Sequence, residues 1–239
     1  MPNDDVILPH DYPDSAAVIV GGGQGSRFGG DKLSITLAGK PLLAWSLGAF
    51  QATPAISSIV IVVPAGCEER FREIACAAGI TKLIAVVSGG AARHESVLRG
   101  LKALPSSVEL VAIHDAARPL VTPDLVMRCL SVAEAAGAAA AAVPVTDTLH
   151  ESDPEKCAVR TVDRTALWAM QTPQVFRLAP LLKLLENIGE GKPTDEVSVV
   201  LAAGWRVPFV ESLTPNFKVT WPDDLALQEA LLKIRTSHS

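Results

Sequence analysis

Apolar runs alternate with helical patterns about every 25 residues along most of the chain, and this rhythm constrains the fold more than any other feature. Short apolar runs typical of buried strands occupy residues 16–20, 58–63, 82–87, 110–113 and 139–145. Helical spacing of apolar residues occupies 41–50, 68–78, 95–103 and 122–136. The alternation predicts an α/β protein with a doubly wound, mostly parallel sheet, whose ligands bind at the carboxyl ends of the strands.

The rhythm breaks over residues 146–171, which carry charges, Pro154 and a polar alternation at 158–162. This pattern predicts a β-hairpin arm that protrudes from the core. Regular structure resumes with a helix over 178–187, a helix from Asp195 capped by Thr194, a strand over 207–210 and a final helix over 223–234. We therefore expect one domain, residues 1–239, with the arm inserted in it and a loose segment at 1–15.

Composition excludes several classes of protein. A hydrophobic fraction of 49% supports a sizeable core, and a formal net charge of −5 argues against general nucleic-acid binding. The four cysteines show no CxxC spacing, which favours reduced thiols over a disulfide framework or a zinc site. Residues 1–15 contain four Asp and no Lys or Arg, unlike a signal peptide. The longest apolar stretch, 138–145, is far shorter than the ~20 residues that cross a bilayer. We expect a cytoplasmic protein without a membrane partner.

A glycine-rich loop follows the first predicted strand. It places six glycines in the ten residues 21–30 and adds two cations, Arg27 and Lys32. Glycines allow backbone N–H groups to approach a ligand closely, so the loop is typical of a site for nucleotide phosphates. The loop matches neither the G-x-G-x-x-G fingerprint of dinucleotide-binding proteins nor the G-K-[ST] ending of a P-loop.

Two other predicted strands end in residues suited to a nucleotide site. Asp115 follows an apolar strand and could bind Mg²⁺, which needs only one or two carboxylates, although an Asp at this position is equally often a helix cap. Gly90 precedes Arg93 and Ser96 at a helix start that could bind a base edge or a phosphate, or could be an ordinary cap. Considered alone, Arg164 and Lys218 are most simply solvated charges.

Several segments taken together resemble the family of 2-C-methyl-D-erythritol 4-phosphate cytidylyltransferases of the non-mevalonate isoprenoid pathway. The resemblance spans roughly residues 16–232. Beyond the glycine loop, it is carried by Gly89–Val97, His114-Asp115-Ala116-Ala117-Arg118-Pro119, Pro144–Thr148, Thr161-Val162-Asp163-Arg164, Gln171-Thr172-Pro173-Gln174, Thr194-Asp195-Glu196 and Asn216-Phe217-Lys218-Val219-Thr220.

The resemblance implies a Rossmann-like nucleotidyltransferase fold and the transfer of CMP from CTP to 2-C-methyl-D-erythritol 4-phosphate, with release of pyrophosphate. It implies that Arg27 and Lys32 hold the α-phosphate and stabilise its transition state, and that Asp115 binds Mg²⁺. The remaining implied contacts are with the nucleotide, through Gly21, Gly22, Gly23, Gly25, Gly90, Arg93 and Ser96, and with the second substrate, through Thr148, Arg164, Thr194 and Lys218.

The resemblance also implies a homodimer, in which Thr148 and Arg164 of one arm serve the partner's site. Two departures stand out. The family commonly has Asp where this chain has Ala91, and the first loop is richer in glycine than the usual Ala-Ala-Gly start.

Three other functions compete with this interpretation. A cytidylyltransferase for another polyol phosphate, such as ribitol 5-phosphate, shares the fold and the loop. A Rossmann-type dehydrogenase is disfavoured by the missing fingerprint and by Val63-Pro64 at the end of the second strand, where an acidic residue is expected. A non-catalytic nucleotide-binding regulator is disfavoured by the presence of Lys32 and Asp115.

Overall fold

The computed structural model describes residues 12–21, 28, 31–188 and 193–237. Its elements, in chain order, are β1 (Ser15–Val20), η1 (Lys32–Ser34), β2 (Thr36–Leu37), β3 (Lys40–Pro41), α1 (Leu42–Gln51), β4 (Ile56–Val63), α2 (Glu68–Ala77), β5 (Leu83–Ser88), α3 (Arg93–Lys102), β6 (Leu110–Asp115), α4 (Pro123–Ala136), β7 (Ala138–Pro144), β8 (Leu149–Ser152), β9 (Ala158–Val162), β10 (Trp168–Arg177), α5 (Leu178–Glu186), α6 (Glu196–Ala202), β11 (Phe209–Glu211) and α7 (Asp224–Ser237). No helix among these residues is long and apolar enough to cross a membrane.

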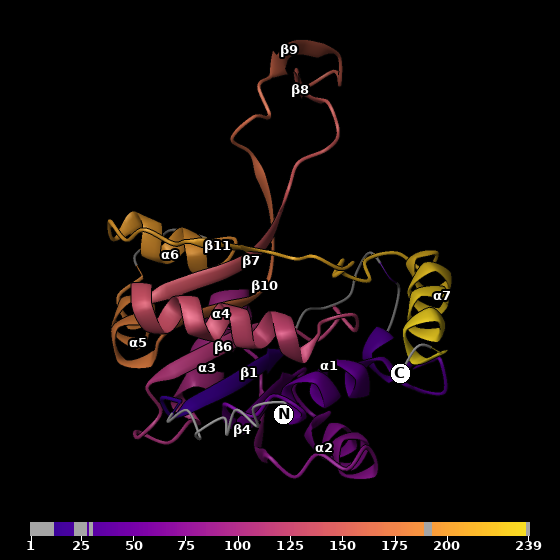
Figure 1. Cartoon of the computed structure of the whole chain (residues 1–239), viewed down its shortest axis with the longest axis vertical. Helices are drawn as coiled ribbons and strands as arrows, with labels where there is room; N and C mark the ends of the chain where they lie inside the picture. Colours follow the sequence, from indigo (N-terminus) through magenta and orange to yellow (C-terminus); the bar gives the residue numbers. More distant parts are fainter. Residues whose placement is uncertain (1–11, 22–27, 29–30, 189–192, 238–239) are drawn as a thin grey trace, which may run out of the picture.

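Seven strands form a central sheet in the order β11-β7-β10-β6-β1-β4-β5, and helices cover both of its faces (Figure 1). All neighbouring strands run parallel except β10, which is antiparallel to β6 and to β7. The predicted doubly wound, mostly parallel sheet is confirmed. The sequence pattern did not predict β10, and its first residues lie inside the range predicted for the arm.

The two faces of the sheet pack against two separate apolar cores. One core joins the sheet to α1, α2 and α4, and the other joins it to α3, α5 and α6. β7 shows the alternation expected of a strand that is buried on both sides, because Ala139 and Ala141 face the first core while Ala138 and Ala140 face the second. These small side chains let helices pack closely against both faces of the strand.

Local sequence signals explain where the helices begin and end, as α4 illustrates. The Thr122 side chain accepts a hydrogen bond from the Leu125 N–H, and Pro123 occupies the first helical turn. Gly137 ends the helix in the left-handed conformation, with φ of 84°, which glycine adopts without steric cost.

The winding direction of the sheet reverses between β1 and β6, which lie side by side and run parallel. In their register Val20 lies opposite Asp115, so Gly21 and Asp115 emerge together at the carboxyl edge of the sheet. Crevices at such a reversal point are where open α/β sheets bind ligands. The fold therefore brings the end of the first strand, at the glycine-rich loop, beside the aspartate at the end of the fourth predicted strand.

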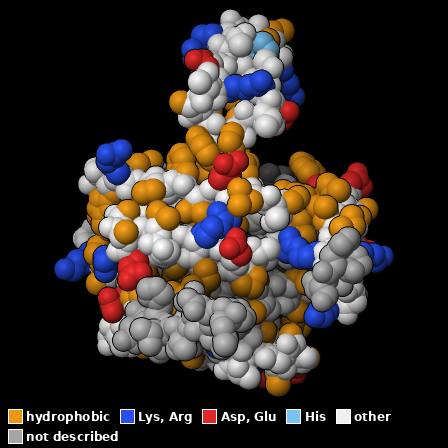
Figure 2. Space-filling model, in the orientation of Figure 1, with side chains coloured by type: hydrophobic (Ala, Val, Ile, Leu, Met, Phe, Trp, Pro, Cys, Tyr) orange, Lys and Arg blue, Asp and Glu red, His pale blue; other side chains and the backbone are white. Residues whose placement is uncertain are grey.

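The arm is a two-stranded antiparallel hairpin, β8–β9, that rises well away from the body (Figure 1). Figure 2 shows it as a separate lobe on a narrow neck. The predicted boundaries, 146–171, extend into the main sheet, because Trp168, Ala169 and Met170 already pair with β7.

Candidate active site

The Asp115 carboxylate lies at the centre of a cluster of cations. Its side chain is 11% exposed, and Lys218 Nζ lies 2.9 Å from Oδ2. Arg118 Nε lies 3.6 Å from the same oxygen, and Arg93 Nη2 lies 3.4 Å from Oδ1. Burial by itself favours the neutral acid, but Lys218, Arg93 and Arg118 outweigh it and hold the pKa of Asp115 well below its usual range. Asp115 is therefore a buried anion in contact with three positively charged side chains.

The backbone of Asp115 is held by a short chain of buried hydrogen bonds. Its N–H donates to Thr172 Oγ1 at 3.0 Å, and Thr172 Oγ1 lies 2.9 Å from His114 Nδ1. Burial lowers the pKa of His114 to about 3, so the imidazole is neutral. The Arg118 carbonyl, 3.3 Å from Nε2, can only accept, so the hydrogen of the neutral ring sits on Nε2. Nδ1 is then an acceptor, and the Thr172 hydroxyl donates to it.

Lys218 reaches Asp115 because the segment that carries it is tied to the sheet on both sides. The Asn216 side chain donates to the Thr172 carbonyl at 2.8 Å and to Gln171 Oε1 at 3.1 Å. Arg118 Nη1 donates to the Asn216 carbonyl at 2.9 Å. Together these bonds fix the backbone two residues before Lys218.

Lys32 joins the same cluster from the other end of the chain. Its Nζ donates to the Val219 carbonyl at 2.8 Å, next to Lys218. Its position is set by Asp31, which caps η1 and accepts from Arg70 Nη1 at 2.8 Å. The structure thus brings together four residues that the sequence predicted for the site: Lys32, Arg93, Asp115 and Lys218.

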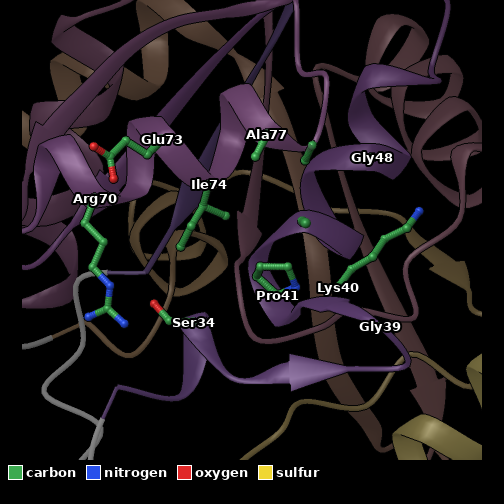
Figure 3. Close-up of a pocket in the computed structure, with 11 residues that line it drawn as sticks. Ser34, Gly39, Lys40, Pro41, Gly48, Arg70, Glu73, Ile74 and Ala77 are labelled. Atoms are coloured by element: carbon green, nitrogen blue, oxygen red, sulfur yellow. The ribbon is translucent and has the colours of Figure 1, made fainter.

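A hollow of about 750 Å³ lies between α1, α2 and the β2–β3 hairpin. Figure 3 shows Arg70 and Ser34 at one end of it and Lys40 at the other. Ser34 and Arg70 also contact Asp31, so the residue that precedes Lys32 also holds two side chains in the wall of this hollow.

Arg93 bridges two carboxylates. Its Nη1 lies 2.6 Å from Glu196 Oε2, and its Nη2 faces Asp115 as described above. Gln174 on β10 fixes the start of α6, where Glu196 lies, by donating to Asp195 Oδ2 at 2.9 Å and accepting from the Val197 N–H at 3.3 Å. The predicted nucleotide contact of Arg93 stays a prediction, because the described contacts of its side chain are with these two acids.

The described glycines of the site have packing reasons to be glycine. A Cβ on Gly21 would lie 2.5 Å from Leu33 Cδ1, and its N–H already donates to the Val62 carbonyl at 2.7 Å. A Cβ on Gly90 would lie 2.4 Å from the Cβ of Glu95, and its N–H donates to Ser96 Oγ at 3.0 Å. Ser96 therefore shapes the second glycine turn, and its predicted contact with cytidine stays a prediction.

Three other predicted site residues, among those that the structure describes, have no described contact with the Asp115 cluster. Thr148 and Arg164 are exposed near the base of the β8–β9 hairpin, and Arg164 Nη1 donates to the Thr146 carbonyl. Thr194 is exposed just before Asp195, which is the observed cap of α6 in place of the predicted Thr194. Arg27, Gly22, Gly23 and Gly25 lie outside the described residues.

Sequence reasoning assigned no role to three residues that the structure places in this network: Arg118, Thr172 and Glu196. Each lies in a polar segment already noted as part of the resemblance, but spacing alone could not connect them. Thr172 contacts a residue 57 positions away and Glu196 one 103 positions away. The available signals were the polar segments themselves, of which only the one that contains Arg118 follows a predicted strand.

Known proteins of similar sequence and fold identify the family of this chain. Residues 15–234 match the family model of IspD, 2-C-methyl-D-erythritol 4-phosphate cytidylyltransferase. The chain belongs to this family. A protein of that name from Cereibacter sphaeroides is 42% identical, with 92% of this chain and 97% of the relative covered. A crystal structure of that name from Thermus thermophilus has a TM-score of 0.72 at 34% identity, covering 92% of this chain and 99% of that one.

Some relatives of this IspD-family chain are longer. It is 42% identical to the bifunctional enzyme IspD/IspF of Desulforudis audaxviator, covering 92% of this chain and 57% of the relative. The chain thus spans little more than half the length of that relative and of a second bifunctional one from Desulfotalea psychrophila, of which it covers 56%.

The bridging hydroxyl of Thr172 gives a testable prediction. Thr172→Val leaves the buried Asp115 N–H and His114 Nδ1 without their partner, which costs about 1–3 kcal/mol for each group. Thr172→Ser keeps the hydroxyl and loses one methyl group, worth about 0.8 kcal/mol. Urea unfolding should therefore show a far larger loss for the Val variant than for the Ser variant. Equal losses in the two variants would contradict the bridge.

Proposed function

We propose that this chain transfers CMP from CTP to 2-C-methyl-D-erythritol 4-phosphate, releasing pyrophosphate and forming 4-diphosphocytidyl-2-C-methylerythritol for isoprenoid biosynthesis. The observation that carries the proposal is the convergence of Arg93, Arg118 and Lys218 on one ionised aspartate at the reversal point of the sheet, with Lys32 bound to the carbonyl next to Lys218. In a chain with a formal net charge of −5, this is a local concentration of cations suited to two anionic substrates.

The proposed reaction needs no general base, and none is apparent among the described residues around Asp115. The attacking phosphate oxygen is already ionised at neutral pH. The histidine nearest the cluster, His114, is buried and neutral, and its two ring nitrogens are occupied by Thr172 and Arg118. Catalysis then consists of positioning the substrates and stabilising the charge that builds up on the α-phosphate.

Lys32 has the most direct part in that stabilisation. Its ammonium group is anchored on the Val219 carbonyl, beside Lys218, in a position fixed before substrate arrives. A preorganised cation needs little rearrangement when charge develops in the transition state, which is why such groups accelerate reactions strongly. We assign Arg27, in the glycine-rich loop, to the α-phosphate as well.

The residues around Asp115 fit a divalent metal. Asp115 offers one ionised carboxylate, and the described part of the chain holds no cluster of three or more potential ligand groups, so the phosphates and water would have to supply most of the ligands. Mg²⁺ suits such a site, because it takes one or two carboxylates and completes its shell with phosphates and water. The metal bound there would neutralise charge on the triphosphate, and Asp115 is the residue that would hold it. Lys218, Arg93 and Arg118 weaken the attraction for a bare ion, so Asp115 should bind the metal together with the nucleotide.

The other assignments complete the site. The nucleotide lies against Gly21, Gly22, Gly23, Gly25, Gly90, Arg93 and Ser96. The sugar-alcohol phosphate contacts Lys218 and Thr194 from one subunit. Thr148 and Arg164 come from the arm of the partner subunit in a homodimer, because both flank the β8–β9 hairpin in the sequence and no described contact joins either of them to the Asp115 cluster of its own chain.

Substrate specificity tests the proposed reaction. Pyrophosphate release should be measured with each of CTP, UTP, ATP and GTP against 2-C-methyl-D-erythritol 4-phosphate and ribitol 5-phosphate. We expect turnover with CTP and methylerythritol phosphate. Turnover only with ribitol phosphate would move the chain to the competing cytidylyltransferase reaction.

Removal of the Lys32 ammonium should slow the chemical step. Lys32→Ala should lower kcat about 10²–10³-fold, the effect typical of losing one preorganised donor. Lys40→Ala is the matched control, because Lys40 lies over the Trp45 ring at 4.9 Å and lines the separate hollow. Turnover near that of the parent in the Lys32 variant would remove Lys32 from the mechanism.

Mixing two inactive variants tests the role of the arm. If Arg164 serves the partner's site, dimers that combine Arg164→Ala with Lys218→Ala contain one intact site. When equal amounts of the two variants pair at random, half of the dimers are mixed, and each mixed dimer has one intact site out of two. About a quarter of the parent activity should therefore return. Each variant alone should show a raised KM for the sugar phosphate or a lowered kcat. No recovery in verified mixed dimers would place Arg164 in its own subunit's site.

A further inference from the structure

Glu196 is a buried carboxylate that the proposed reaction does not use. It is the first residue of α6, and only 1% of it is exposed. Its two carboxylate oxygens lie 2.5 and 2.6 Å from Arg93 Nη1. Among the residues that the structure describes, Arg93 is the only side chain that donates to Glu196. A buried carboxylate requires such a partner, so Arg93 is held firmly toward α6.

The contact between Arg93 and Glu196 affects Asp115, because the same guanidinium group faces both acids. Arg93 Nη2 stops 3.4 Å from Asp115 Oδ1, whereas Lys218 Nζ approaches Oδ2 to 2.9 Å. Charge-assisted N–H···O bonds are normally about 2.7–2.9 Å long. The contact of Arg93 with Oδ1 is therefore stretched, while its contact with Glu196 is tight. Oδ1 is the less occupied oxygen of the central aspartate.

A purely structural role for the Arg93–Glu196 pair does not explain why a buried charge pair occurs here. Gln174 already ties the start of α6 to β10 through Asp195 and Val197. Leucine and valine side chains of α3, α5 and α6 pack in a shared apolar core. Neither arrangement needs a buried charge pair, and a buried ion pair is weak evidence for stability by itself. The feature that distinguishes this pair is its second contact, with Asp115.

We propose that Glu196 is a positioning residue, which draws Arg93 away from Asp115 and so keeps Oδ1 available to a divalent cation that enters with the nucleotide. The inference rests on the proposed function. Removing the negative charge of Glu196 releases Arg93 to close on Asp115, where it competes with the metal. Partners that orient a metal-binding carboxylate or histidine typically change metal affinity or activity about 10–100-fold when they are mutated.

Metal binding tests the proposal directly. Mn²⁺ binding in the presence of CTP should be measured by electron paramagnetic resonance for the full-length chain, without the second substrate. Glu196→Gln should weaken Mn²⁺ binding about 10–100-fold. In activity assays it should raise the Mg²⁺ concentration needed for half-maximal rate and leave the KM for the sugar phosphate unchanged.

Two further variants separate this role from a structural one. Glu186→Gln removes the partner of Lys102, an ion pair of 2.9 Å that also joins α3 to another helix, and it should leave Mn²⁺ binding unchanged. The double variant Arg93→Gln/Glu196→Gln removes the competing cation together with its restraint. Because Arg93 is itself assigned to the nucleotide, the reference is Arg93→Gln, and the double variant should bind Mn²⁺ as tightly as Arg93→Gln does at saturating CTP. It also provides the test if Glu196→Gln fails to fold, because it buries a neutral pair.

The outcomes are distinct. Unchanged Mn²⁺ binding in folded Glu196→Gln, or binding by the double variant that is tenfold weaker than binding by Arg93→Gln, would overturn the proposal. No Mn²⁺ binding by the parent chain would overturn it as well. If Mn²⁺ binding changes among the variants as expected but the parent chain releases no pyrophosphate, the proposed reaction is refuted and the role of Glu196 stands.

Discussion

The Asp115 carboxylate stays ionised almost out of contact with water, and the arrangement around it follows from that constraint. A buried charge is costly unless cations and hydrogen bonds surround it. Here the cations come from three separate parts of the chain: Arg93 at the start of α3, Arg118 in the turn after β6, and Lys218 in the segment before α7. The interaction that keeps one aspartate charged also joins these segments into one site.

The antiparallel strand β10 makes this convergence possible. Its pairing with β7 shifts register between Met170 and Gln174, which frees the intervening polar residues from the regular ladder. Thr172 then supports Asp115 on one side, while Gln171 and Gln174 support the Lys218 segment and the start of α6. An interrupted strand at the centre of a sheet thus supplies the buried polar groups that position the cations.

Much of the framework was predictable because its signals are local. Apolar periodicity located β1, β4, β5, β6 and β7, and the positions of strand ends singled out Asp115 and the glycine-rich loop. β10 was missed because it continues directly from the arm and its second half leads straight into a helix. Arg118, Thr172 and Glu196 received no role, because their partners lie in other elements. No spacing rule reports a hydrogen bond between residues that are 57 or 103 positions apart.

By itself, the sequence determined the α/β class, and it predicted a ligand site at the carboxyl edge of the sheet and nucleotide phosphates as the ligand, because strand periodicity, glycine content and cation type are properties of short segments. Only the tertiary structure decided how the charged residues divide their contacts. Arg93 was predicted as a nucleotide contact, and the fold places it between Glu196 and Asp115. That division depends on the relative positions of α3, α6 and β6, which are set by packing of the two cores and by the order of strands in the sheet.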